Sequence, residues 1–263
     1  MSHPLLELEH RYGKNYHILN DPFLSTLLAL LCSRETRQPL LTDLIKRLYQ
    51  SLLLYVIGRE FPCKNNRVKT RMFRMHKEAV LREKMTDFGI KVVTVDLARA
   101  GIVPSQLCYD FLNHFFKPQR VRQDHAYIQR MVNHMGQVTG SHIGGYKIGG
   151  PVHDAIVLLP DPMGATGASI CETVALYKNK ILGKPLKFIA LHLIITPEYL
   201  KKVKKEHSDL IVYALRLDRG LSSKKILRSA PGTYWHQEKG LNQNHYIVPG
   251  AGGLGELLNN SFV

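Results

Sequence analysis

The segment 160–169 combines small residues, two hydroxyl groups and a carboxylate, a set of groups that could hold a phosphorylated sugar. It follows an apolar run, 155–159, and precedes a helical pattern of apolar residues. Small residues let backbone N–H groups approach a phosphate closely, and the N-terminus of the next helix favours negative charge there. Thr166 and Ser169 can donate hydroxyl hydrogen bonds to this phosphate, and Asp161 can accept hydrogen bonds from ribose hydroxyls. A tight strand-to-helix turn would explain the small and hydroxyl residues but not the acid, so we predict a ribose phosphate cradle.

Four segments, in order along the chain, carry a resemblance to a known family. Residues 156–169 resemble the phosphoribosyl-pyrophosphate (PRPP) motif of type I phosphoribosyltransferases, with Asp-Pro-Met and Ala-Thr-Gly in the form typical of uracil phosphoribosyltransferases. Arg99-Ala100-Gly101 is similar to that family's pyrophosphate loop. Residues 217–221 resemble the strand before its base-binding region, and residues 246–250 resemble its uracil-recognition loop. The layout of residues 21–59 is similar to the family's opening helices, so the resemblance covers nearly the whole chain.

The resemblance implies a set of site residues. For PRPP, the matching positions are Arg99, Ala100, Gly101, Asp161, Pro162, Met163, Gly164, Ala165, Thr166, Gly167, Ala168 and Ser169. For uracil, the matching positions are Tyr246, Ile247, Gly252, Gly253 and Leu254. Within these sets, the resemblance implies that Arg99 and Asp161 are the catalytic residues.

The implied reaction transfers the 5-phosphoribosyl group from PRPP to uracil and gives UMP and pyrophosphate, a step of pyrimidine salvage. Mg²⁺ would enter with PRPP, so no metal ligands of the protein itself are predicted. Arg99 would neutralise the departing pyrophosphate, and Asp161 would face the positive charge that develops on the ribose. Backbone groups of Ile247 and of the turn at 252–254 would bind uracil. The family also implies a homodimer or a homotetramer.

Three positions of the C-terminal loop depart from the family pattern, in which Gly-Asp-Ala-Gly-Asp and a basic residue follow the Pro-Gly. Gly253 replaces the first aspartate, Glu256 replaces the second, and Leu257 replaces the basic residue. The change at Gly253 removes a carboxylate from the reacting centre. An arginine that the family carries before its flexible hood is not assigned, because ungapped counting reaches His134 and the nearest arginine is Arg130.

These departures keep two other kinds of function open. One is a catalytically silent homologue that binds nucleotide or PRPP and acts as a nucleotide sensor; the other is a regulator that binds RNA. The formal net charge of +15 suits an anionic partner, and basic residues gather over 59–84 and over 201–205. A solvated basic face would look the same, so nucleic acid is an alternative partner rather than the preferred one. The insertion at 221–241 contains Trp235 and could be a lid, an interface or a surface loop that packs its own aromatic residues.

The elements that must position these segments alternate between strands and helices. Apolar spacing predicts helices over 39–57, 71–84, 104–115 and 168–182, and Thr196 and Pro197 begin another. Apolar or β-branched runs predict strands over 91–97, 155–159, 188–195 and 210–217. This order predicts an α/β fold, a three-layer parallel β-sheet flanked by helices, type I phosphoribosyltransferase-like, with a small hood and an N-terminal helical extension.

The bulk composition agrees with one globular domain. We expect a single phosphoribosyltransferase-like domain over 1–263, with an N-terminal helical extension (1–90), a PRPP-binding core (91–220) and an insertion with the base-binding loop (221–263). The four cysteines are scattered, which argues against disulfides or a zinc site. The sequence has neither a signal-peptide pattern nor an apolar run of membrane-spanning length, so we expect a cytoplasmic protein with no membrane partner.

Overall fold

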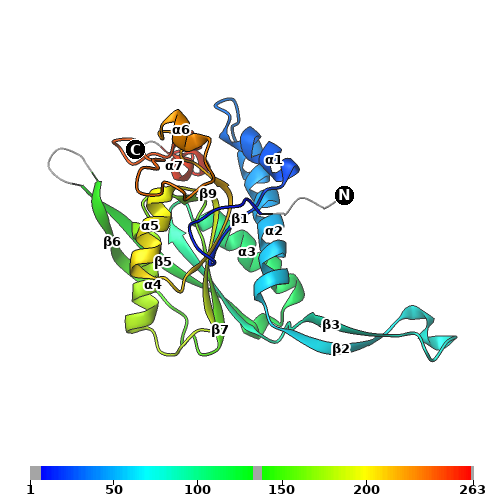
Figure 1. The fold of residues 1–263 in the computed structure, drawn as a ribbon. Coiled ribbons are helices and arrows are strands. Elements are labelled where there is room, and N and C mark those ends of the chain that lie inside the picture. The colour runs from blue at the N-terminus through cyan, green and yellow to red at the C-terminus, as the bar shows by residue number, and fades with distance from the viewer. Residues whose placement is uncertain (1–6, 133–137, 262–263) are drawn as a thin grey trace.

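The computed structural model describes residues 7–132 and 138–261, and its central feature is one large, mostly parallel sheet (Figure 1). Its strands lie in the order β1-β10-β9-β7-β4-β5-β6, and β8 pairs with β9. They are β1 (Tyr16–Ile18), β4 (Lys91–Ala98), β5 (Val121–Val132), β6 (Val138–Lys147), β7 (Ala155–Pro160), β8 (Met163–Gly164), β9 (Lys187–Ile195) and β10 (Ile211–Leu217). Neighbouring strands are parallel except for β5 and β6, which are antiparallel.

Helices cover both faces of this sheet. They are α1 (Pro22–Cys32), α2 (Leu40–Glu60), α3 (Ile102–Phe115), α4 (Ala168–Lys180), α5 (Pro197–Glu206), α6 (Lys224–Leu227) and α7 (Leu254–Leu258), with the 3-10 helices η1 (Arg71–Arg74) and η2 (Pro118–Arg120). Alternate residues of β7 face two different cores. Ile156 and Leu158 pack with α1, α2 and α3, whereas Val157 and Leu159 pack with α4 and α5. Burial on both faces explains the unbroken apolar sequence of β7 and confirms the predicted three-layer fold.

Most predicted helices are present with small shifts of their ends. The helices predicted over 39–57, 104–115 and 168–182 correspond to α2, α3 and α4. The predicted cap of α5 is confirmed, because Thr196 Oγ1 accepts a hydrogen bond from the Tyr199 N–H at 3.0 Å. In the described parts of the chain, no helix combines the length and the apolar character needed to cross a membrane.

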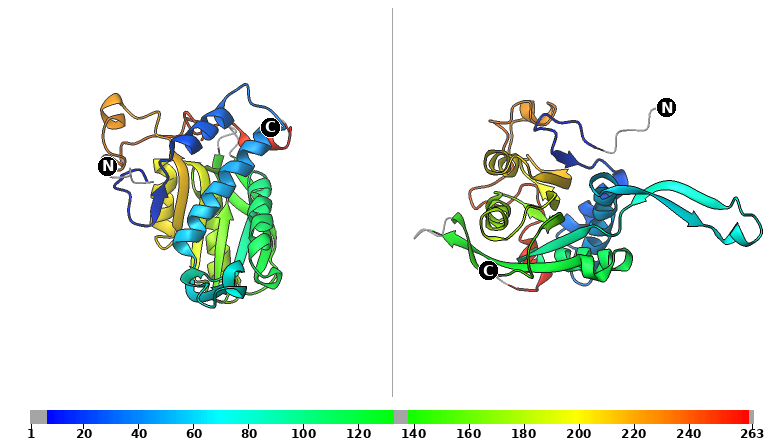
Figure 2. Two further views of the ribbon diagram at one scale, coloured as in Figure 1. Left: turned by 90° about the vertical axis from the view of Figure 1, so that its right-hand side faces the viewer. Right: turned by 90° about the horizontal axis from the view of Figure 1, so that it is seen from below.

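The helix predicted over 71–84 is wrong. In its place, β2 (Cys63–Lys69) and β3 (Val80–Thr86) form an antiparallel two-stranded ribbon, with η1 between them. This ribbon, hereafter the arm (63–86), projects away from the body of the protein (Figures 1 and 2). Leu81, Glu83 and Lys84 favour a helix by propensity, but cross-strand pairing decides the local structure. The segment 1–90 is therefore not only helical, since it also supplies the arm and β1.

Sequence patterns did not predict β5 and β6, which occupy much of the stretch between 116 and 154. Many positions of these strands are polar or glycine, and β6 lies at the edge of the sheet. An edge strand is covered by fewer neighbours than a central one, so its apolar pattern is weak.

Candidate functional site

A cavity of about 400 Å³ lies at the carboxyl ends of β4 and β7. Three segments far apart in the sequence bound it: the loop after β4, the loop after β7 and the C-terminal segment 245–256. The predicted site residues that line it are Arg99, Ala100, Asp161, Met163, Gly164, Ala165, Thr166, Gly167, Ala168, Ser169, Tyr246, Ile247, Gly252, Gly253 and Leu254. The fold thus brings the segments predicted for PRPP and for uracil to one cavity.

Gly101 and Pro162 were predicted to contact PRPP but do not line the cavity. A Cβ on Gly101 would lie 2.8 Å from the backbone N and O of Leu97, so the loop after β4 closes only with glycine there. The Pro162 carbonyl accepts hydrogen bonds from the N–H groups of Leu193 and Ile194, each at 3.1 Å. Both residues therefore shape the loops behind the cavity lining.

The loop after β7 turns directly into α4. Asp161 Oδ1 accepts a hydrogen bond from the Met163 N–H at 3.2 Å, which closes the first turn of this loop. Gly167 occupies the N-cap of α4 with φ 82°, a left-handed conformation that glycine adopts without Cβ strain. Thr166 Oγ1 accepts from the Ala168 N–H at 3.4 Å. The first residues of the 13-residue helix α4 line the cavity, so its N-terminal N–H groups favour an anion there.

A buried pair of side chains supports this loop from below. His192 of β9 and Tyr199 of α5 are both fully buried. His192 Nδ1 lies 2.5 Å from the Asp161 carbonyl, which can only accept, so Nδ1 carries the proton. His192 Nε2 therefore accepts from the Tyr199 hydroxyl at 2.7 Å. Burial lowers the pKa of His192 to about 4, so the imidazole under the loop is neutral at pH 7.

The Arg99 side chain reaches from the loop after β4 to the C-terminal segment. Its Nη1 donates to Ser261 Oγ at 2.9 Å, and its Nη2 lies 3.8 Å from Glu256 Oε1. About half of the side chain remains exposed, so the guanidinium can reach an anion in the cavity. Arg99 and Glu256 thus place opposite charges side by side on the cavity wall.

Glu256 fills the space that a side chain at position 253 would enter. A Cβ on Gly253 would lie 2.6 Å from Glu256 Oε2. Gly253 has φ −80°, which any residue adopts, whereas its neighbour Gly252 has φ 67° and is left-handed. The sequence comparison with the family suggested a missing carboxylate at Gly253; in space, a carboxylate from the first turn of α7 lies beside this position.

The third wall of the cavity is the segment predicted to bind uracil. Ile247 is buried and forms an isolated β-bridge with Leu241, while Tyr246 is 39% exposed. His245 also lines the cavity and has φ 60°, an uncommon conformation for a residue other than glycine. Asn242 supports this turn, because its Oδ1 accepts from the Tyr246 N–H at 2.9 Å and its carbonyl accepts from the His245 N–H at 3.0 Å.

Sequence reasoning did not place His245 or Tyr199 in the site, and it named Glu256 only as the replacement of a family aspartate. Glu256 was aligned with a family aspartate, so its position next to the motif was a usable signal. Nothing in the pattern around Tyr199 distinguished it from a core residue of α5. Of the two candidates for the family arginine, His134 lies outside the described residues, and the side chain of Arg130 is not described either.

The insertion at 221–241 packs against the body of the protein instead of covering the cavity. Trp235 contacts the ring of Tyr12 in an edge-on arrangement at 4.9 Å and donates its indole N–H to the Pro197 carbonyl at 2.9 Å. Below it, Glu238 is 2% exposed and accepts hydrogen bonds from Tyr12 and from Arg219. Trp235 is not among the residues that line the cavity. The structure therefore favours a packed surface loop over a lid.

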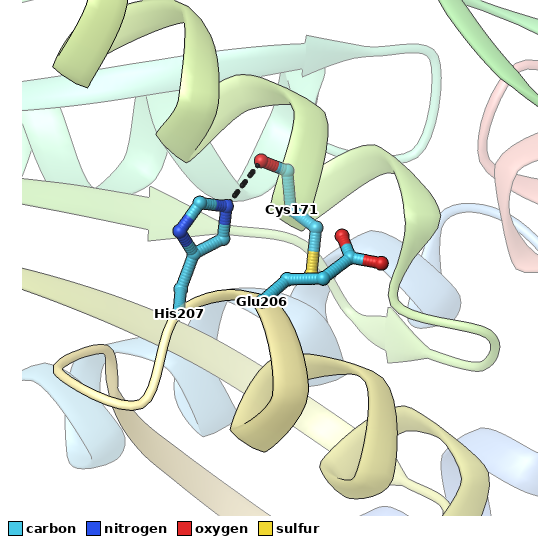
Figure 3. A group of neighbouring side chains, drawn as sticks. All are labelled: Cys171, Glu206 and His207. Atoms are coloured by element: carbon cyan, nitrogen blue, oxygen red, sulfur yellow. Dashed lines mark hydrogen bonds between the residues drawn. The ribbon is translucent and has the colours of Figure 1, made fainter.

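Outside the cavity, Cys171, Glu206 and His207 bring three potential metal ligands within 4.8 Å of one another (Figure 3). Each has another role in the structure. His207 Nε2 donates to the Cys171 carbonyl at 2.8 Å, so that nitrogen has no lone pair for a metal. Glu206 pairs with Lys202 at 2.8 Å, and burial raises the pKa of the Cys171 thiol to about 12. The His207–Cys171 hydrogen bond joins the end of α5 to α4, and a neutral thiol is a poor metal ligand.

Three comparisons with known proteins identify the family that this chain resembles and the fold that it shares. Residues 18–233 match the family described as uracil phosphoribosyltransferase. A uracil phosphoribosyltransferase of Paraburkholderia phytofirmans is 26% identical over 246 residues, covering 93% of this chain and 94% of the relative. One from Campylobacter jejuni is 25% identical over 254 residues, covering 94% and 99%. The solved structure of the AQ2163 protein from Aquifex aeolicus has the same fold, with a TM-score of 0.67, 20% identity and coverage of 92% of this chain and 97% of that one.

Proposed function

The chain belongs to the uracil phosphoribosyltransferase family and has the type I phosphoribosyltransferase fold, and on this premise we propose that it converts uracil and PRPP into UMP and pyrophosphate. Family and fold together support PRPP-dependent phosphoribosyl transfer. The observation that carries the proposal is the single cavity formed by the ribose phosphate cradle, the loop of Arg99 and the C-terminal segment. Pyrimidine salvage in the cytoplasm is the corresponding cellular role, and it suits a chain whose four cysteines are all free thiols.

In this proposal, the cradle binds the ribose phosphate. The 5′-phosphate accepts hydrogen bonds from the N–H groups at the start of α4 and from the hydroxyls of Thr166 and Ser169. Asp161 accepts hydrogen bonds from the ribose hydroxyls. His192 and Tyr199 hold the backbone of the loop in place, because both are fully buried and hydrogen-bonded to one another.

The reaction breaks the bond between ribose C1′ and the pyrophosphate oxygen and forms a bond between C1′ and uracil N1, which releases its proton. Arg99 and the Ala100 N–H would stabilise the negative charge that develops on pyrophosphate. Asp161 and Glu256 would stabilise the positive charge on the ribose. Because the protein supplies no covalent step, its contribution is positioning and electrostatic stabilisation.

Mg²⁺ would enter with PRPP as part of the substrate. The cavity lining is compatible with this, since Asp161 and Glu256 are carboxylates, the oxygen ligands that Mg²⁺ prefers. Bound with PRPP, the ion would neutralise charge on the pyrophosphate oxygens.

A homodimer or homotetramer is part of the proposal. It is supported by apolar side chains that a monomer would leave in water: Phe23 and Leu30 of α1 are 68% and 50% exposed, and Leu54 of α2 is 59% exposed. Light scattering on the purified protein would test it, and a monomer would contradict it.

The test of function is a UMP-formation assay with PRPP, Mg²⁺ and a panel of bases. We expect product with uracil, and none with adenine or hypoxanthine, because in this proposal the backbone of the turn at 252–254 binds a pyrimidine edge. Binding of PRPP without any product would identify a catalytically silent homologue that senses nucleotide. Absence of both would remove the transferase proposal.

A second candidate function, RNA binding, is favoured by one specific observation. The arm carries eight lysines and arginines against two glutamates, and Arg67 lies directly opposite Arg82. Like charges opposite each other destabilise a ribbon, so an anionic partner would stabilise it. RNA binding that weakens in Arg67→Ser but not in Lys201→Ser, on the other basic face, would support this function. RNA binding that is unchanged in Arg67→Ser, or no RNA binding at low salt, would exclude this second function.

A further inference from the structure

Arg216 and Asp218, at the end of β10, form a planar ion pair beside the base-binding segment. Arg216 Nε donates to Asp218 Oδ1 at 2.6 Å, and Nη2 donates to Oδ2 at 2.9 Å. Asp218 is 2% exposed and the Arg216 side chain is 28% exposed, so the carboxylate is shielded from water and the guanidinium is partly shielded. Such a two-bond pair fixes the orientation of both side chains.

The same pair holds both ends of one glycine. The Gly250 N–H donates to Asp218 Oδ2 at 2.7 Å, and the Gly250 carbonyl accepts from Arg216 Nη2 at 3.2 Å. Gly250 has φ 62°, and a Cβ on it would lie 2.2 Å from the Ile247 carbonyl oxygen. The turn from Ile247 to Gly250 is thus so tight that a shift of Gly250 must also shift the Ile247 backbone.

A second Arg-x-Asp pair has the same construction elsewhere in the fold. Arg122 Nε and Nη2 donate to Asp124 at 2.9 and 3.1 Å. Asp124 Oδ1 accepts from the Gly149 N–H at 2.8 Å, and Arg122 Nη2 donates to the Gly150 carbonyl at 2.9 Å. Neither glycine lines the cavity. The second pair therefore provides an internal control, with the same arginine–aspartate–glycine contacts away from the cavity lining. Asp124 has one further contact, a hydrogen bond accepted from the Tyr177 hydroxyl at 2.7 Å.

We infer that Arg216 and Asp218 are positioning residues for the base: they hold the Ile247 backbone, through Gly250, where it meets the planar ring. This inference rests on the proposed function, in which Ile247 and the turn at 252–254 bind uracil through backbone groups. Backbone hydrogen bonds to a flat base tolerate little displacement, because a shift of about 1 Å lengthens all of them together. In the part of the chain that the structure describes, the hydrogen bonds of the two side chains join them to one another, to Gly250 and to Cys32, and none reaches the ribose phosphate cradle, so we expect an effect on the base.

The experiment compares two ligands that differ in the base, UMP and ribose 5-phosphate, by calorimetric titration. The variant Asp218→Asn keeps the shape but loses the charge, and its amide NH₂ only donates. Whichever carboxylate oxygen the NH₂ replaces, at least one hydrogen bond from Arg216 or the Gly250 N–H is lost. We expect the affinity for UMP to fall about tenfold, as for loss of one charged hydrogen bond, while the affinity for ribose 5-phosphate is unchanged. Asp124→Asn should leave both affinities at their wild-type values, although it lowers the melting temperature.

Arg216→Lys is the second variant, since it keeps the charge and loses the two-bond geometry. It should show the same selective loss, and it decides the question if Asp218→Asn does not fold. In steady-state assays, both variants should raise KM for uracil and leave KM for PRPP alone. An equal loss for UMP and ribose 5-phosphate, or no loss in either variant, would overturn the inference. A wild-type protein that makes no UMP would instead refute the proposed function, so the two failures are distinguishable.

Discussion

Replacing Gly253 by aspartate while Glu256 is present should lower the rate of UMP formation. A Cβ at position 253 would lie 2.6 Å from Glu256 Oε2, so the new carboxylate competes with the existing one for the same space. Two carboxylates about 4 Å apart repel by about 4 kcal/mol near a protein surface, so Glu256 must turn away or one group must take up a proton. Either response disturbs Arg99, whose Nη2 lies 3.8 Å from Glu256 Oε1. We expect kcat to fall about tenfold, equivalent to about 1.4 kcal/mol.

The same substitution should have the opposite effect once Glu256 is neutral. In the proposed reaction Glu256 stabilises the positive charge on the ribose, so Glu256→Gln should lower kcat by about tenfold to hundredfold. In that background the uncharged end of the flexible side chain at position 256 can turn aside, so Gly253→Asp supplies a new carboxylate with no charge to oppose it, and kcat should rise. The backbone at Gly253 permits the change, because φ is −80°.

The assay is steady-state UMP formation by wild type, both single variants and the double variant, with melting temperatures measured to confirm folding. The expected result is that the effect of Gly253→Asp on kcat changes sign: it lowers kcat in the wild-type background and raises kcat in the Glu256→Gln background. A faster Gly253→Asp single variant would refute the claim that Glu256 supplies the carboxylate. Full activity of Glu256→Gln would show that no carboxylate at this place takes part in the reaction.

Three further predictions concern the cradle, the pyrophosphate loop and pH. PRPP or UMP should raise the melting temperature of the wild type, and Thr166→Val should lose most of this shift while the free protein stays folded; an unchanged shift would locate the phosphate elsewhere. Arg99→Ala should lower turnover more than it weakens UMP binding, because its charge matters most as pyrophosphate leaves, and equal losses would make Arg99 a general anion contact. The pKa of His192 is lowered to about 4 by burial. It is about 6.5 in an unfolded chain, so the stability from its neutral form is complete above pH 6.5 and is lost as the pH falls toward 4, by about 3 kcal/mol. Urea unfolding should therefore show a smaller loss of stability between these pH values in His192→Gln than in wild type, and equal losses would argue against this assignment.

Much of the site could be predicted because it lies in short, continuous segments. The cradle is one loop between a buried strand and a helix, and both of these elements have strong local patterns. The strand β7 is apolar throughout, and Gly167 is the N-cap at which α4 begins. Thr196 could likewise be predicted as a helix cap, because capping depends on residues three positions apart. The free energy that decides such features comes from neighbours in sequence.

Other parts of the fold could not be predicted, because the interactions that decide them join distant residues. The residues of β3 favour a helix by propensity, yet they pair with β2 in the arm. β5 and β6 have weak apolar patterns, with many polar residues and glycines, and β6 also lies at the edge of the sheet, where fewer side chains are buried. Gly101 and Pro162 belong to the motifs but do not line the cavity, because the placement of a loop residue depends on what the loop packs against.

The sequence by itself determined the α/β class, the position of the cradle and the order of the segments that meet around it, since each follows from periodicity, capping and small residues in a local stretch. Only the tertiary structure decided which groups share a space. It places the Glu256 carboxylate beside Gly253 and hydrogen-bonds His192 to the Asp161 carbonyl of the cradle. It also hydrogen-bonds Asp218 to Gly250, 32 positions away. The physical reason is that charge, burial and hydrogen bonding act over a few ångströms in space, whatever the separation along the chain.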